Sequence, residues 1–227
     1  MISRARTQAE RTRATTDQLV SAARDLFAAD GYDATLLDAV VERAGVTTGA
    51  LYHHFSGKRA LFAAVYEAEQ RCIEHAVRLA ASESSHSWES FAAGCQAFFD
   101  TALDTGFQQI LIDAPAVLGW AQMREIEDRH LMALIKQGIA QAMEDGHIKP
   151  RRVDPLAHQL HGAMCESAMM IVRADDPPHE ASDARAAFEE LLNGITVSPE
   201  NGVAADRTTG SSRTSRRGAG RRSRQRS

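Results

Sequence analysis

The stretch GVTTGALYHHFSGKRAL, from Gly45 to Leu61, gathers residue types that could do chemistry. Its consecutive histidines, His53 and His54, could ligate a metal, and Gly57-Lys58 partly matches a phosphate-binding loop. Consecutive residues of a helix point about 100° apart, so two such imidazoles do not easily reach one ion, and no Cys or carboxylate follows at ligand spacing. The Gly-Lys pair lacks the upstream glycine, the following Ser or Thr and a preceding strand. Neither a metal nor a nucleotide is therefore expected here.

A helix-turn-helix explains more of this stretch. Helical periodicity predicts two short helices joined at Gly45, and the second helix of such a pair can enter the major groove of DNA. With Leu51 and Phe55 pointing inward, the outward face carries residues that can bond phosphates or base edges. These residues, with the lysine that follows them, are Thr47, Thr48, Gly49, Tyr52, His53 and Lys58. On spacing alone, a helical hairpin with a solvated polar face remains an alternative.

The run GYDATLLDAVVERAGVTTGALYHHFSGKRALF, from Gly31 to Phe62, closely resembles the DNA-binding domain of TetR/AcrR-family transcriptional regulators. The glycine-tyrosine entry, the AGV turn, the G-x-LYxHF recognition helix and the lysine after it carry the resemblance, which covers about residues 15–66. It implies that the six residues above contact DNA and that His54 packs against the following helix.

Two positions depart from the family pattern. Leu36 stands where the family usually has a Thr or Ser that caps the second helix and contacts a phosphate, so Thr35 is the substitute that we expect to cap and to contact DNA. Val41 replaces a usual alanine, which would hold the two helices slightly farther apart.

The whole chain of 227 residues is predicted to be all-α. We expect one helix to run from Thr15 to Gly31, with Thr15 and Gln18 forming a capping box at its start. A second helix is expected to run from Ser56, which would cap it, to about Ala81. The other helices are predicted at about 37–44, 47–55, 88–104, 108–113, 120–144, 155–173 and 182–193. The predicted organisation is a basic disordered arm (1–14), a helix-turn-helix domain (15–66), a helical effector-binding and dimerisation domain (67–197) and a disordered Arg/Ser-rich tail (198–227).

Charge and cysteine content narrow the possible functions. Residues 1–59 and 200–227 carry net charges of +1 and +6, whereas residues 60–199 carry −11, so only the two ends suit a polyanion. Four arginines in the arm and eight in the tail could follow DNA phosphates or be merely solvated. The three cysteines are far apart, no disulfide is expected, and the absence of a signal peptide or membrane span predicts a cytoplasmic protein.

A single helix-turn-helix binds one half-site, so we expect a homodimer on a palindromic operator. Its interface is predicted on the apolar faces of the last two helices, although these faces could instead serve only the core of one chain. The interface residues are Leu156, Leu160, Met164, Ile171, Phe188, Leu191 and Leu192.

The middle helices carry apolar residues and a few polar groups that, by the resemblance, would enclose a pocket for a small hydrophobic effector. The predicted lining is Phe98, Phe99, Trp120, Met123, His130, His161, Cys165 and Met169, each of which could alternatively be ordinary core. His158, His161 and Cys165 have a spacing that would allow a metal, but a fourth ligand is not evident, so no metal or cofactor is predicted.

The sequence therefore predicts a DNA-binding transcriptional regulator, a repressor that a small effector releases from its operator. The alternative is a helical effector- or partner-binding protein that has lost specific DNA recognition. An enzyme is not expected, because the chain shows no nucleophile-base pair, metal-ligand set or glycine-rich cofactor loop.

Overall fold

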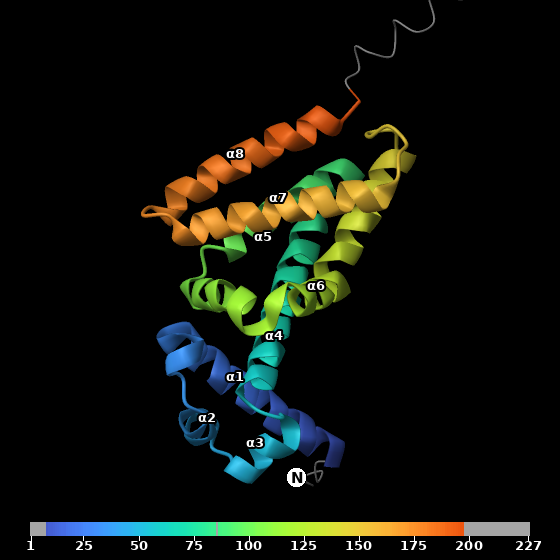
Figure 1. The fold of residues 1–227 in the computed structure, drawn as a ribbon. Coiled ribbons are helices and arrows are strands. Elements are labelled where there is room, and N and C mark those ends of the chain that lie inside the picture. Colours follow the sequence, from blue (N-terminus) through green and yellow to red (C-terminus); the bar gives the residue numbers. More distant parts are fainter. Residues whose placement is uncertain (1–7, 85, 198–227) are drawn as a thin grey trace, which may run out of the picture. The chain divides into compact units, whose positions relative to one another are not determined.

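The computed structural model describes residues 8–84 and 86–197, and this part of the chain is helical as predicted. The helices are α1 (Gln8–Ala34), α2 (Leu37–Ala44), α3 (Thr48–His54), α4 (Lys58–Ala81), α5 (Ser87–Thr101), α6 (Thr105–Glu144), α7 (Val153–Arg173) and α8 (Pro177–Ile195) (Figure 1). A single antiparallel bridge joins Ile148 to Thr196 within the described ranges. The predictions for residues 1–7 and for the tail from residue 198 lie outside the described residues.

Helix α1 begins earlier than predicted. Residues 8–14 were expected in a disordered arm, but they are helical, since Gln, Ala, Glu and Arg favour a helix. Thr15 therefore lies inside α1 and does not cap it. The predicted stop at Gly31 is confirmed as a break, because Gly31 has φ 76° and ψ 171° and only a short helical turn follows it.

Other helix ends also differ from the prediction. Helix α4 follows Gly57 without a side-chain cap, so Ser56 does not cap it. The pieces predicted at 108–113 and 120–144 belong to one longer element, α6, which bends at Gly119. Helix α8 begins at Pro177 rather than near Ser182, because proline suits a first helical turn and the side chain of Asp176 accepts the amide of His179.

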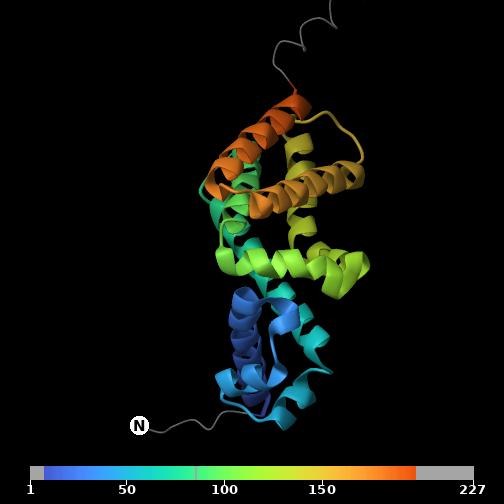
Figure 2. The same cartoon turned by 60° about the vertical axis from the view of Figure 1, so that its left-hand side comes forward.

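One apolar core holds α1–α4 together and is closed by α6. This N-terminal cluster consists of Leu19, Ala22, Ala23, Phe27, Val40, Val41, Leu51, Leu61, Phe62, Val65, Tyr66, Ile110, Ala114, Leu118, Met123 and Ile126. Its last five members lie on α6, and Figures 1 and 2 show the first half of α6 crossing α4 above α1. The helices beside the predicted DNA-binding surface therefore share a core with the helices that carry the predicted pocket.

A second core joins the end of α4 to α5, the second half of α6, α7 and α8. It buries six of the seven residues predicted to form a dimer interface: Leu156, Leu160, Met164, Ile171, Phe188 and Leu192. For these six the prediction is wrong, since the more apolar faces of α7 and α8 pack inside the same chain. Leu191 is 44% exposed and Met170 is 51% exposed, so both lie on the outer faces of these helices.

No helix in the described ranges is both long and apolar enough to span a membrane.

Candidate nucleic-acid interface and ligand cavities

Local hydrogen bonds build the turn between α2 and α3. Gly45 adopts a left-handed conformation with φ 66°, and its amide donates to the carbonyl of Glu42. The amide of Val46 donates to the carbonyl of Val41, which completes a Schellman arrangement. The hydroxyl of Thr47 then accepts the amide of Ala50 at 3.1 Å and caps α3. The predicted break at Gly45 and cap at Thr47 are both confirmed.

Helix α3 separates its inward residues from its outward residues as predicted. Leu51 is fully buried and Phe55 is partly buried against the N-terminal cluster. Thr47, Thr48, Gly49, Tyr52 and His53 are all exposed, and the side chain of Tyr52 is 58% exposed. The side of α3 that points away from the core thus offers two hydroxyls, a glycine and two amphipathic rings.

Lys58 lies between the end of α1 and the start of α4. Its Nζ donates to the carbonyl of Asp33 at 3.1 Å and lies 4.5 Å from the centre of the Tyr32 ring. The ammonium group is therefore held against the end of α1 by contacts of the protein itself.

His54 forms a hydrogen bond with α1. Its Nδ1 lies 3.1 Å from Oγ1 of Thr16, so its hydrogen-bonding partner is on α1 and not on α4. The assignment of His54 to packing rather than to DNA agrees with its partly buried side chain.

The structure contradicts both roles predicted for Thr35. Its side chain is buried, and its hydroxyl donates to the carbonyl of Gly31 at 2.8 Å. The N-cap of α2 is Leu36, which is 68% exposed and makes no side-chain capping bond. Because the bend at Gly31 turns Thr35 inward, its hydroxyl neither caps α2 nor faces a phosphate.

A cavity of about 290 Å³ lies between α4, α6 and α7, and we call it the α6–α7 cavity. Six of the eight predicted effector residues line it: Phe98, Trp120, Met123, His161, Cys165 and Met169. Its lining is mainly apolar. Five polar residues of the lining contact one another, and we call them the polar end of the cavity: Tyr66, Arg124, Glu127, His161 and Cys165. The sequence prediction missed Tyr66, Arg124 and Glu127 at that end. Arg124 and Glu127 gave no clear signal, because Glu125, Asp128 and Arg129 beside them are charged as well.

Hydrogen bonds connect the polar end of the α6–α7 cavity to α4. The hydroxyl of Tyr66 donates to Oε1 of Glu127 at 2.8 Å, and Nη1 of Arg124 lies 3.2 Å from the other carboxylate oxygen. Arg124 also contacts Nδ1 of His161, and its guanidinium carbon lies 4.6 Å from the centre of the Trp120 ring.

Burial shifts the protonation equilibria at this end of the cavity. Burial is the main reason that the pKa of His161 is lowered to about 4, and the positive charge of Arg124 is the second. The imidazole is therefore neutral near pH 7. Burial also raises the pKa of Cys165 to about 12, and the nearby carboxylate of Glu127 adds to this increase. The pKa of Glu127 is itself raised by burial, while Tyr66 and Arg124 act in the opposite direction.

The other two predicted effector residues do not line the α6–α7 cavity. Phe99 is fully buried and packs edge-on against Phe188, with ring centres 5.4 Å apart. His130 faces α4, where its Nδ1 lies 3.0 Å from Oε2 of Glu74. These two predictions are wrong because both side chains project from their helices toward other neighbours.

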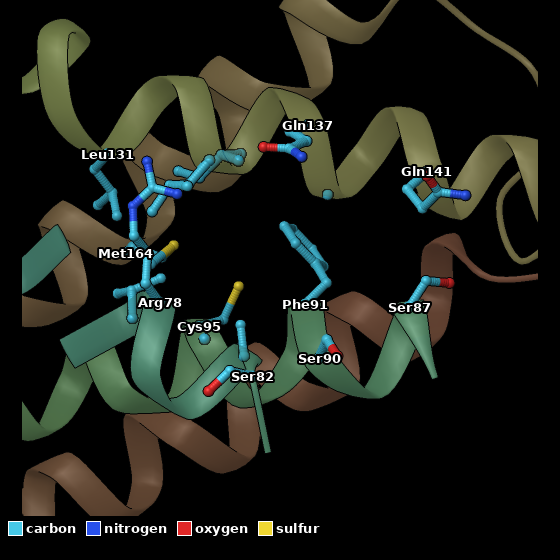
Figure 3. Close-up of a pocket in the computed structure, with 16 residues that line it drawn as sticks. Arg78, Ser82, Ser87, Ser90, Phe91, Cys95, Leu131, Gln137, Gln141 and Met164 are labelled. Atoms are coloured by element: carbon cyan, nitrogen blue, oxygen red, sulfur yellow. The ribbon is translucent and has the colours of Figure 1, made fainter. Parts of the chain in front are cut away.

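A second cavity, of about 410 Å³, lies between the end of α4, α5 and α6. Figure 3 shows the ring of Phe91 projecting from α5 toward α6 between Gln137 and Gln141. This ring fits closely over Gly138, where an added Cβ would lie 2.3 Å from its Cδ2. No sequence signal pointed to this cavity, because its walls mix apolar residues with scattered polar ones such as Ser90, Gln137 and Gln141.

Among the described residues, one group of three side chains has metal-ligand geometry: Glu127, His161 and Cys165. All three line the α6–α7 cavity, and their ligand atoms lie within 4.8 Å of one another. The set considered from the sequence had His158 in place of Glu127, but His158 is exposed and outside this group.

Comparisons with known proteins agree with this arrangement. Residues 19–65 match the model of bacterial regulatory proteins of the tetR family, and residues 88–195 match that of a tetracyclin repressor-like C-terminal domain. A solved TetR-family transcriptional regulator from Pectobacterium atrosepticum is 32% identical with a TM-score of 0.75, over 86% of this chain and 100% of that one.

Two further relatives extend over most of the chain. The TetC protein of transposon Tn10 from Escherichia coli is 24% identical over 192 residues, which are 84% of this chain and 95% of that protein. The crystal structure of RolR in complex with resorcinol shares the fold at 20% identity, with a TM-score of 0.66 over 86% of this chain and 93% of that one.

Proposed function

Since the chain belongs to the TetR family of transcriptional regulators and is thus a DNA-binding regulator, we propose that it is a repressor released by a small effector. In this proposal α3 enters the major groove of an operator half-site, and the effector binds in the α6–α7 cavity. The observation that carries the effector proposal is the Tyr66–Glu127 hydrogen bond, because it joins α4 to the polar end of the cavity.

The proposed DNA contacts are the exposed residues of α3 and the lysine after it: Thr47, Thr48, Gly49, Tyr52, His53 and Lys58. Gly49 has only the hydroxyl of Thr47 near its missing Cβ, so a DNA backbone can approach closely there. Tyr52 and His53 can reach base edges or phosphates. Lys58 is the first residue of α4 and follows α3 closely in the chain. Thr35 is left out of this set because its hydroxyl is buried.

The dimer needed for a palindromic operator is proposed to form through the outer faces of α7 and α8. Met170 and Leu191 are the large exposed apolar residues on these two helices. Smaller side chains around them, such as Ala163, Ser167 and Ala187, would allow the helices of two copies to approach closely. Two recognition helices would then lie about 34–36 Å apart, one turn of DNA.

The α6–α7 cavity favours an effector with a flat apolar body and at least one hydrogen-bond acceptor. Phe98, Met123 and Met169 provide apolar walls, and the guanidinium of Arg124 provides hydrogen-bond donors at the cavity wall. Resorcinol, the ligand in the RolR structure, supports an effector of about the size of a small phenol.

Effector binding is proposed to act on DNA through α4 and α6. Helix α4 begins beside α3 at Lys58 and carries Tyr66 at the cavity, two turns later. An effector that favours a different tilt of α4 changes the spacing of the two recognition helices. Such coupling typically amounts to about 1–3 kcal/mol, roughly a 5- to 150-fold change in DNA affinity.

The DNA proposal is tested by selecting bound sequences from random DNA and then titrating the enriched operator by fluorescence anisotropy. A palindrome with two half-sites is expected, and Tyr52→Ala should weaken its binding about tenfold or more. Glu144→Ala, at an exposed position at the end of α6, is the control that should bind as the unmodified chain does. Failure to enrich any sequence would favour the alternative of a partner-binding protein that has lost DNA recognition.

The effector proposal is tested with resorcinol and benzoate as probes. One of them should raise the melting temperature and weaken operator binding, and Met169→Trp, which fills the cavity, should abolish both effects. Leu134→Trp, which fills the second cavity instead, should leave them intact. If Leu134→Trp blocks the probe and Met169→Trp does not, the second cavity is the effector site.

A further inference from the structure

We propose that Glu127, His161 and Cys165 form a binding site for a divalent transition-metal ion, of which zinc is the best match. This inference concerns the polar end of the α6–α7 cavity and does not depend on the proposed DNA-binding or effector function.

The backbone brings the three ligands together from two helices. His161 and Cys165 stand four residues apart on α7 and so face the same side, and Glu127 faces them from α6. Sγ of Cys165 lies 3.6 Å from Nε2 of His161. Thiolate and imidazole ligands at about 2.3 Å and 2.0 Å from a tetrahedral zinc are about 3.5 Å apart, so the separation of this pair matches. Because Sγ also lies 3.9 Å from Nδ1, the two side chains would have to reorient to direct their lone pairs at one ion.

The donor set favours zinc over calcium or magnesium. A thiolate and an imidazole select zinc and similar ions, whereas the two hard ions require mostly oxygen ligands. His161 and Glu127 are buried, and all three side chains border the cavity. Three protein ligands with the fourth position open to a cavity leave room for a water or for an effector atom.

Tyr66 supplies the support that metal-binding carboxylates usually have. Its hydroxyl donates to Oε1 of Glu127, so an ion would take the other carboxylate oxygen, which Arg124 contacts in its absence. Such outer hydrogen bonds hold a ligand in its binding orientation. Because Tyr66 belongs to α4, an ion at this site would also fix the position of α4 relative to α6.

Arg124 occupies part of the space between two of the ligands. Its guanidinium lies against the second oxygen of Glu127 and against Nδ1 of His161, the imidazole nitrogen that is not proposed to bind the ion, so it competes with the ion for the carboxylate of Glu127. An ion would displace this guanidinium, and the exposed ring of Trp120, on which it already stacks, can retain it. Arg124 thus competes with the metal, and its removal should strengthen metal binding.

Binding releases one proton from the thiol. The Cys165 thiol gives up its proton to solvent as the sulfur–metal bond forms, and the neutral imidazole of His161 binds without losing one. No other atom or electron is exchanged, so the ion keeps its oxidation state.

Titration of the metal-free protein with Co²⁺ tests the proposal. One equivalent should produce a thiolate-to-cobalt charge-transfer band in the near ultraviolet and the visible bands of a tetrahedral ion, and Zn²⁺ should abolish both. Cys165→Ser should lose the charge-transfer band, whereas Cys72→Ser, at an exposed position on α4, should keep it. Glu127→Gln should weaken binding at least tenfold, and Arg124→Gln should strengthen it severalfold.

A full charge-transfer band in Cys165→Ser, or none in the unmodified protein, would overturn the proposal. Circular dichroism of the metal-free variants separates loss of a ligand from loss of fold. Since DNA is absent from this assay, failure here leaves the proposed DNA-binding function untouched.

Discussion

The guanidinium of Arg59 donates a hydrogen bond of 3.0 Å to the carbonyl of Leu118, the last residue before the bend in α6. Its Nε also donates to the carbonyl of Val117 at 2.9 Å. The bend at Gly119 interrupts the helix directly after these carbonyls, and an arginine near the start of α4 donates to both of them. A second bond, from the amide of Tyr32 to Asp113, joins α1 to the same half of α6.

Replacing Arg59 by alanine should lower the free energy of unfolding by about 1–2 kcal/mol, because two helix-end carbonyls lose a charged donor. Urea denaturation monitored by circular dichroism gives this value. Arg43→Ala is the matched control, since its exposed ion pair with Asp25, at 3.4 Å, should contribute no more than about 0.5 kcal/mol. Equal losses in the two variants would show that the Arg59 contact does not stabilise the junction.

Replacing Leu36 by threonine should stabilise the protein, because α2 begins at an exposed leucine that forms no capping bond. A threonine there can accept an amide of the first turn, with an expected gain of up to about 1 kcal/mol. It also presents a hydroxyl to a DNA phosphate, so operator affinity measured by anisotropy should increase. Leu36→Ala removes the same apolar side chain without adding a cap, and a gain of equal size in that variant would contradict the capping explanation.

Replacing Gly119 by alanine should destabilise the protein by about 1–3 kcal/mol. Gly119 has φ 73° and ψ 161°, a conformation open almost only to glycine, and no atom lies within 4 Å of its missing Cβ. The cost would therefore come from the backbone and not from a clash. Gly162→Ala, inside α7 and equally unobstructed, should instead be neutral or stabilising by up to about 1 kcal/mol in the same thermal melts.

One of the three thiols should react rapidly with Ellman's reagent in the folded, metal-free protein near pH 8. Burial raises the pKa of both Cys95 and Cys165 to about 12, so only a very small fraction of either is thiolate at that pH. Cys72 is exposed on α4. Cys72→Ser should abolish the fast phase, and reaction of a second thiol at the same rate would show that one of the buried cysteines is accessible.

The DNA-binding segment could be predicted in detail because its structure depends on near neighbours. The left-handed Gly45 and the Thr47 cap each depend on hydrogen bonds to residues within about five positions, so their signals lie in one short window. The inward side of α3, with Leu51, followed from its apolar spacing. The prediction for Thr35 was wrong because the position of this residue depends on a distant part of the chain. The bend at Gly31, which is packed beside Gln109 and Asp113 of α6, turns Thr35 inward.

The cavity could be predicted only in part, since helical periodicity identifies an apolar face but not the helix that covers it. Trp120, Met123 and Cys165 were placed correctly, but Phe99 and His130 face other neighbours.

By itself the sequence determined the all-α architecture, the helix-turn-helix and the exposed residues of α3, because each follows from periodicity and from hydrogen bonds between close residues. Only the tertiary structure decided that the apolar faces of α7 and α8 are used inside the chain. It likewise decided that Glu127, rather than His158, lies beside His161 and Cys165, and that Arg59 closes the end of a distant helix. These outcomes depend on which helix faces pack together, and the packing of all the helices against one another determines this.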